Sequence, residues 1–181
     1  MKKTVLTFGL ISGAICTGMM LSVAPFADKI GFNVGEVLGY TSIVLSALMI
    51  FFGIRSFRDN VAGGRITFGR AFKVGILIAL ISSACYVASW EFVYYKLMPD
   101  FADKYAAHMV ERAKASGATQ QKIDDTMRQA REFKVMYDKP LNNIALTFME
   151  VFPIGLLVTL ISAWVLRRTQ GGGTVLGAAS S

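Results

Sequence analysis

Two acidic residues at the edges of apolar segments are the side chains of this sequence best placed for chemistry. Glu150 interrupts an apolar segment at about residues 144–166, and Glu91 follows another at about 74–90. A carboxylate in or near hydrocarbon is costly, and such groups often mark ion paths, proton relays or ligand sites. Glu150 and Glu91 are therefore the candidate site residues. Together they could form a proton or cation site between two helices.

A structural interpretation of the same two acids stays open. Glu91 could be hydrated at a membrane surface, and Glu150 could pair with Lys139, Lys96 or Tyr94. Both acids are expected at a shallow depth, where a charge costs less than at the bilayer centre. We favour this interfacial role over a functional one.

The remaining reactive side chains give no catalytic or metal-binding pattern. Cys16 and Cys85 lie inside apolar segments, and His108 is the only imidazole. No second ligand stands at metal-binding spacing, and nothing resembles a hydrolase elbow, a zinc-protease helix or a kinase signature. We expect no disulfide, no metal, no cofactor and no enzymatic activity, and a membrane enzyme acting on lipid has no residue set to support it.

Five basic residues lie between the second and third apolar segments. They are Arg55, Arg58, Arg65, Arg70 and Lys73. Phe and Gly residues are interleaved with them, but Gly63-Gly64 is not followed by the Gly-Lys-Ser/Thr of a phosphate-binding loop. Basic residues beside a membrane attract anionic headgroups and set orientation. We assign these five residues to topology and lipid contact.

The composition requires a membrane protein. Of 181 residues, 54% are hydrophobic and 17% charged, which leaves too few charges to cover a water-facing surface. The net charge of +7 does not indicate nucleic acid, because its placement beside apolar segments explains it. Four segments have the ~20 apolar residues that a membrane helix needs. They cover about residues 4–24, 37–54, 74–90 and 144–166.

The first segment also resembles a secretory signal. Lys2 and Lys3 precede it, and Ser22-Val23-Ala24 resembles a cleavage site. Pro25 would follow the cut directly, and the apolar run exceeds a typical signal core. We expect the segment to be retained as a span.

The basic residues predict the orientation of the spans. Lys2 and Lys3, the connection between spans two and three, and Arg167 with Arg168 are basic and belong on the cytoplasmic side. Lys29 in the first connection is outweighed by Asp28 and Glu36, which places that connection outside. Both termini are then cytoplasmic, and the long third connection lies outside.

The third connection reads as an extracytoplasmic helical hairpin at about residues 99–138. Gly117 and Thr119 supply a stop and an N-cap between two amphipathic stretches. The apolar stripes could lie on headgroups or receive another protein, but packing against each other is the interpretation we favour. The fold prediction is an all-α four-helix transmembrane bundle, one domain over residues 1–168, with a flexible cytoplasmic tail at 169–181.

Small and hydroxyl-bearing residues predict close helix packing. Gly9 and Gly13 stand four apart, and Gly31, Gly35 and Gly39 repeat that spacing. Such spacing lets helix backbones approach closely in lipid. Hydroxyls at Ser82, Tyr86 and Ser89 share one face of the third span. Packing within the chain explains both patterns, and a homodimer through the same faces is the alternative.

With the spans placed, the chain resembles a bacterial family of four-span membrane proteins, domain of unknown function 4199, over roughly residues 3–168. The resemblance rests on the stretch from Phe57 to Gly75, on Trp90-Glu91-Phe92, and on Pro140-Leu141-Asn142 before a span that closes in Arg167-Arg168. It implies a bacterial inner-membrane protein and no activity. We therefore predict a non-enzymatic structural or interaction protein of the bacterial envelope, contacting lipid and other envelope proteins or itself. A small transporter using Glu150 is the alternative.

Overall fold

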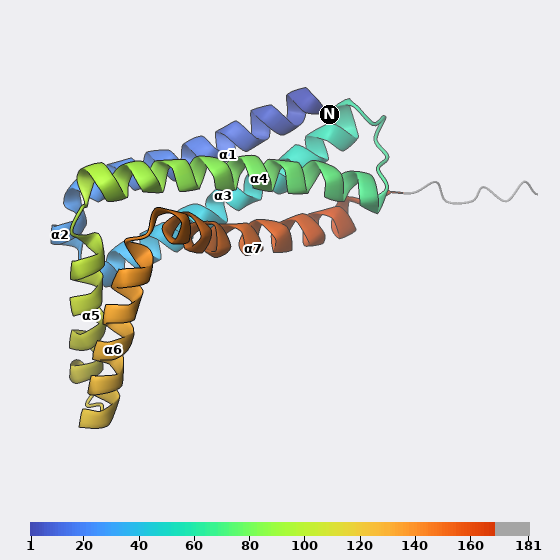
Figure 1. Cartoon of the computed structure of the whole chain (residues 1–181). Helices are drawn as coiled ribbons and strands as arrows, with labels where there is room; N and C mark the ends of the chain where they lie inside the picture. The colour runs from blue at the N-terminus through green and yellow to red at the C-terminus, as the bar shows by residue number, and fades with distance from the viewer. Residues whose placement is uncertain (169–181) are drawn as a thin grey trace, which may run out of the picture.

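Four long helices run alongside one another and a pair of shorter helices projects from one end of them. The computed structural model describes residues 1–168; the predicted tail, 169–181, lies outside the described residues. In Figure 1, α1, α3, α4 and α7 form the bundle, and α5 and α6 lie side by side across its direction. The described part of the chain contains no β-strand apart from one isolated bridge.

The elements follow one another in a simple order. They are α1 (Lys2–Val23), η1 (Ala24–Phe26), α2 (Ala27–Ile30), α3 (Phe32–Asn60), α4 (Phe68–Phe92), η2 (Val93–Leu97), α5 (Phe101–Ala115), α6 (Gln120–Tyr137) and α7 (Pro140–Leu166). Four helical segments are long and apolar enough to cross a membrane. The prediction of an all-α fold with four helices suited to cross a membrane is therefore confirmed.

The bundle helices are longer than the apolar segments predict. The 27 residues of α7 span about 40 Å at ~1.5 Å per residue, against a hydrocarbon thickness of ~30 Å. The extra turns have local causes: Pro140 begins α7 with the φ that a first helical residue needs, and Gly31, at φ 77°, separates α2 from α3. Apolar composition marks the middle of each helix, which is suited to contact lipid, and does not mark its ends.

Three basic parts of the chain lie at one end of the bundle. Figure 1 shows the N-terminus, the α3–α4 connection and the end of α7 together, at the end opposite α5 and α6. The backbone N–H of Arg168 donates to the carbonyl of Ile66 at 2.9 Å, which ties the end of α7 to that connection. The side of the membrane on which this end lies remains a prediction.

Close helix contacts occur where glycine faces a neighbouring helix. A Cβ on Gly13 of α1 would lie 2.6 Å from Cβ of Cys85 on α4, and one on Gly9 would lie 2.9 Å from Cβ of Ile81. A hydroxyl layer crosses the bundle at the same level. Ser12 donates to the carbonyl of Ser46 at 2.8 Å, and its Oγ lies 2.7 Å from that of Ser82. Helix packing within the chain thus accounts for these residues.

Candidate functional site

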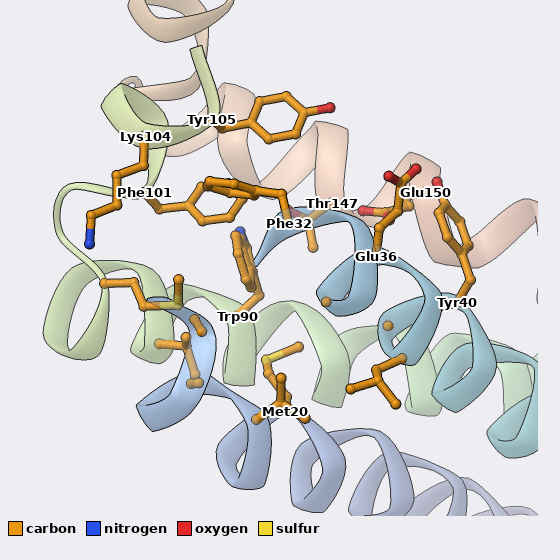
Figure 2. A pocket seen from close by; sticks show the side chains of 18 of the residues that line it. Met20, Phe32, Glu36, Tyr40, Trp90, Phe101, Lys104, Tyr105, Thr147 and Glu150 are labelled. Atoms are coloured by element: carbon orange, nitrogen blue, oxygen red, sulfur yellow. The ribbon is translucent and has the colours of Figure 1, made fainter. Parts of the chain in front are cut away.

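A cavity lies in the bundle at the end that carries α5 and α6. Its volume is about 550 Å³, within the range of small-molecule sites. Side chains from α1, α3, α4 and α7 form its walls, and residues of α5 and α6 cover it (Figure 2). The cavity is the feature of the described residues that best fits a binding site.

Two carboxylates from different helices face each other in this cavity. Glu36 belongs to the first turns of α3 and Glu150 to the first half of α7. In Figure 2 their carboxyl groups and the hydroxyl of Tyr40 point toward the same space. Neither carboxylate forms a salt bridge within residues 1–168. The cavity therefore contains two carboxyl groups that have no basic partner among the described residues.

Buried hydroxyls complete the polar part of the lining. The side chain of Tyr86, on α4, is 8% exposed and lines the cavity. Its hydroxyl has no hydrogen-bond partner in the part of the chain that the structure describes. Thr147, one turn before Glu150, is 2% exposed and donates to the side-chain oxygen of Asn143 at 3.2 Å. Tyr86 thus offers a free oxygen to anything that enters.

The rest of the lining is apolar and aromatic. Met20 of α1 and Trp90 of α4 line the cavity, and Phe32, Phe101 and Tyr105 lie above them (Figure 2). The ring centroids of Phe32 and Phe101 are 5.9 Å apart, and those of Trp90 and Phe101 are 4.9 Å apart. The cavity thus combines an acidic corner with an aromatic cover.

Glycines of α3 leave room in the cavity wall. Gly31, Gly35 and Gly39 all line it, and a Cβ on any of them would meet nothing within 4 Å. They share the four-residue spacing of Gly9 and Gly13 but not their role. The expectation that this second set packs helices closely within the chain is not met at these positions, because a Cβ on any of them would contact no atom of the described chain.

Polar contacts fix the cover on the bundle. The indole N–H of Trp90 donates to the hydroxyl of Tyr137 at 2.8 Å, and the hydroxyl of Tyr94 donates to Asp138 at 2.9 Å. Lys104 of α5 pairs with Asp28 of α2 at 2.7 Å. Burial raises the pKa of Tyr137 to about 12, so its hydroxyl stays protonated at neutral pH. The cover is therefore attached by three contacts, to α4, η2 and α2.

Lys104 is also paired within its own helix. Its ammonium lies 2.9 Å from Asp100 as well as 2.7 Å from Asp28. Hydrogen bonds to the carboxylates of Asp28 and Asp100 raise the pKa of Lys104. The hydrogen bond between Lys104 and Asp100 also lowers the pKa of Asp100. The one basic residue of the cavity lining is thus already engaged with other acids.

The bundle is tightly packed beyond the cavity. Cys16, Ile43 and Val151 are buried directly beneath it, and the serine layer around Ser12 follows. Further along, a Cβ on Gly75 would lie 2.7 Å from Cγ2 of Thr159. The cavity is therefore closed toward the basic end of the bundle.

The other candidate residues lie elsewhere. Glu91 is not part of the cavity lining, and its Oε1 is buried without a hydrogen-bond partner within residues 1–168. Ser82 lies in the serine layer below the cavity. Glu150 forms no ion pair with Lys139 or Lys96 among the described residues, and Tyr94 binds Asp138 instead. The structure thus pairs Glu150 with Glu36, and not with Glu91.

The five basic residues lie at the opposite end of the bundle. Arg58 pairs with Asp59 at 2.7 Å, and Arg55 lies 3.7 Å from the same carboxylate. The guanidinium of Arg70 lies over the ring of Phe57, 5.3 Å from its centroid. Arg65 and Lys73 are exposed. None of the five lines the cavity, so their contact with lipid headgroups remains a proposal.

The sequence pattern misses Glu36 and Tyr40. Glu36 falls outside the apolar window of the second span and counts there as a loop acid, although it belongs to the same helix. The sequence does contain a signal for them. Glu36 and Tyr40 are four residues apart and so lie on the same side of the helix, and each is preceded by a glycine, Gly35 or Gly39, which leaves space beside these polar groups. Only the register between α3 and α7 shows that Glu150 completes the group.

The arrangement can bind a cation but offers little for covalent chemistry. The described residues contain no group of three side chains suited to hold a metal ion. Two carboxylates and tyrosine hydroxyls accept hydrogen bonds from a positively charged donor, and the aromatic rings can contact an apolar body.

Comparison with known proteins gives a family and no activity. Neither the curated proteins nor the solved structures contain a match to this chain. A family model described as a protein of unknown function, DUF4199, matches residues 7–168, which include α1 from residue 7 onward, every later helix and the cavity lining. The chain belongs to the DUF4199 family.

Proposed function

We propose that this chain is a non-enzymatic interaction protein of the bacterial envelope, held in the inner membrane by its four spans with both termini in the cytoplasm. In this proposal the α5–α6 pair, called the arm below, meets other envelope components outside the membrane. The attachment of the arm to the bundle carries the proposal.

That attachment makes the arm a fixed extension of the bundle. Trp90 and Tyr137 join the arm base to α4, and Lys104 joins it to α2 through Asp28. Within the arm, α5 and α6 bury Ala102 and Ala130, and Lys134 pairs with Asp103 across them. A fixed arm loses little conformational entropy when it binds a partner.

Cross-linking in native membranes tests this proposal. A photo-activated amino acid at Ser116, in the exposed turn at the arm tip, is expected to give a discrete adduct with one envelope protein or with a second copy. The same probe at Val44, which is exposed on the apolar surface of α3, is expected to react with lipid only. Equal labelling at both positions, or no protein adduct at Ser116, would contradict the proposal.

A small ion-coupled transporter is the second candidate function. The observation in its favour is the cavity that contains Glu150 and Tyr86. The close packing from Cys16 to Thr159 weighs against it, because transport needs a route to the other end of the bundle. Liposome flux should then depend on Glu150, and flux left unchanged by Glu150→Gln would reject this mechanism.

A further inference from the structure

We propose that the cavity binds an amphipathic organic amine, with its ammonium group between Glu36 and Glu150 and its apolar body against the aromatic cover. This inference concerns the cavity alone and does not depend on what the arm meets. It assigns a ligand class to a site that is separate from the arm tip.

The charge of the cavity selects a cation. Glu36 and Glu150 repel each other, and neither has a basic partner among residues 1–168. In surroundings of low dielectric constant, two neighbouring carboxylates are stabilised by a positive charge between them. Lys104 is held by Asp28 and Asp100, so its charge is already balanced.

A second hollow borders the acidic pair from the outer side of α3. It shares Glu36 and Tyr40 with the cavity, and Arg112 of α5 is part of its lining. Arg112 forms no salt bridge with Glu36 in the described part of the chain. The guanidinium therefore leaves the carboxylate free to bind a ligand.

The hydrogen-bonding groups match an ammonium. A primary ammonium has three N–H donors and no acceptor. The lining offers two carboxylates and the hydroxyl of Tyr86, whose side chain is 8% exposed and forms no hydrogen bond within residues 1–168. The lining thus presents three acceptor groups from three helices, α3, α4 and α7.

The size and lining of the cavity select an organic cation over a metal ion. Calcium and magnesium need about six or more oxygen ligands in a tight shell. Here the volume is about 550 Å³, and most of the wall consists of side chains such as Met20, Trp90 and Phe101. An apolar body of drug-like size fills such a space, and aromatic rings also attract cations.

Two sources of the same chemistry fit the site. One is a free amphipathic amine, and the other is an aminolipid of the bilayer whose headgroup ammonium enters from the membrane. Both place the ammonium at Glu36 and Glu150. The experiment below separates them.

Trp90 provides a reporter inside the cavity. The chain has two tryptophans, and Trp164 is 61% exposed at the far end of α7. Full-length Trp164→Phe protein in phosphatidylcholine nanodiscs then reports binding through Trp90 fluorescence. The probes are the cationic 4-phenylbutylamine, the neutral 4-phenylbutanol and the anionic 4-phenylbutyrate. They share the phenyl ring and the alkyl chain and differ in the polar end group.

The amine is expected to change Trp90 fluorescence saturably and to bind at least about tenfold more tightly than the alcohol or the acid. This comparison uses the native carboxylates, so it does not depend on any variant folding. Equal affinity for amine and alcohol would overturn the proposal.

Carboxylate variants locate the ammonium. Glu36→Gln and Glu150→Gln together should weaken amine binding at least about tenfold and leave alcohol binding unchanged. Glu91→Gln is the matched control, because Glu91 lies near the same end of the bundle but outside the cavity lining. Amine affinity that is equal in the native and the double-variant protein would also overturn the proposal.

A filled cavity gives an independent check. Gly39→Leu places a side chain where a Cβ meets nothing within 4 Å, so it should fill space without a clash. All amine binding should weaken, while the thermal unfolding temperature stays at or above that of the parent. Unchanged amine binding in this variant would place the ligand outside the cavity.

Lipid composition identifies the source. Adding phosphatidylethanolamine to the nanodiscs should reduce the apparent affinity of 4-phenylbutylamine if an aminolipid occupies the site, whereas N-acetylated phosphatidylethanolamine should not. Amine binding that both lipids leave unchanged assigns the site to a free amine. Loss of probe affinity with both lipids equally would show that the headgroup charge is irrelevant and would overturn the proposal.

Discussion

The indole N–H of Trp90 donates a 2.8 Å hydrogen bond to the hydroxyl of Tyr137 and so joins the third span to the last turn of α6. Tyr137 is 9% exposed, and its ring packs against Tyr94 and Phe133. Trp90 also lines the cavity, so one bond both fixes the arm and positions the cavity cover. The arm and the cavity are thereby mechanically connected.

Removing this hydroxyl should destabilise the arm. Tyr137→Phe keeps the ring but leaves the indole N–H of Trp90 without its acceptor, which costs about 1–3 kcal/mol if the group stays buried. Thermal unfolding in detergent should shift down, and Trp90 fluorescence should change. Tyr95→Phe is the control, because that side chain is 44% exposed. Equal unfolding temperatures for the two variants would show that the bond contributes nothing.

The contact between Gly13 and Cys85 predicts a position-specific effect of a single methyl group. Gly13→Ala should destabilise the bundle by about 1–3 kcal/mol, because its Cβ would lie 2.6 Å from Cβ of Cys85. Gly18→Ala, on the same helix with nothing within 4 Å, should be neutral or stabilising by up to ~1 kcal/mol. Unfolding by denaturing detergent measures both.

Cys85→Gly offers a rescue of the same contact. It removes the Cβ and Sγ that the new methyl group would meet, so the Gly13→Ala and Cys85→Gly double variant should lose less stability than the two single changes added together. Strict additivity would mean that the two positions do not touch.

The sequence predicts the spans well because bilayer thickness imposes them. It predicts the contacts between spans less well, as the two glycine sets illustrate. Gly9 and Gly13 meet α4, whereas Gly35 and Gly39, at the same spacing, face the cavity. The spacing places small residues on one helical face, but the tertiary arrangement decides whether another helix occupies that face.

The acidic pair shows the same limit at the candidate site. Glu150 is recognisable because it interrupts an apolar segment, but Glu36 falls among the polar residues before the second segment. Their proximity depends on how far α3 extends past its apolar middle and on its register against α7. No local sequence pattern encodes that register.

The contact of Lys104 with Asp28 and Asp100 predicts a pH window for the attachment of the arm. The pKa of Asp100 is lowered, so its stabilising effect is present above the unfolded value of about 4 and is lost as the pH falls below it. The pKa of Lys104 is raised, so its effect is present below about 10.5 and is lost at higher pH.

Trp90 fluorescence in the Trp164→Phe background should therefore be constant between these limits and change outside them. Lys104→Gln should remove most of this dependence, and added salt should weaken it because the three groups are partly exposed. Lys96→Gln is the control, since Lys96 forms no salt bridge in residues 1–168. An identical pH profile in the Lys104 and Lys96 variants would reject this account.

The gathering of the basic segments at one end of the bundle predicts which residues face the cell exterior. In a Cys16→Ser and Cys85→Ala background, a cysteine at Ser116 in the arm tip should react with a membrane-impermeant maleimide on intact cells. A cysteine at Val61, which is 51% exposed in the α3–α4 connection, should react only after lysis. The physical reason is that Arg and Lys beside spans are retained in the cytoplasm. The reverse labelling pattern would invert the orientation and place the arm and the mouth of the acidic cavity inside the cell.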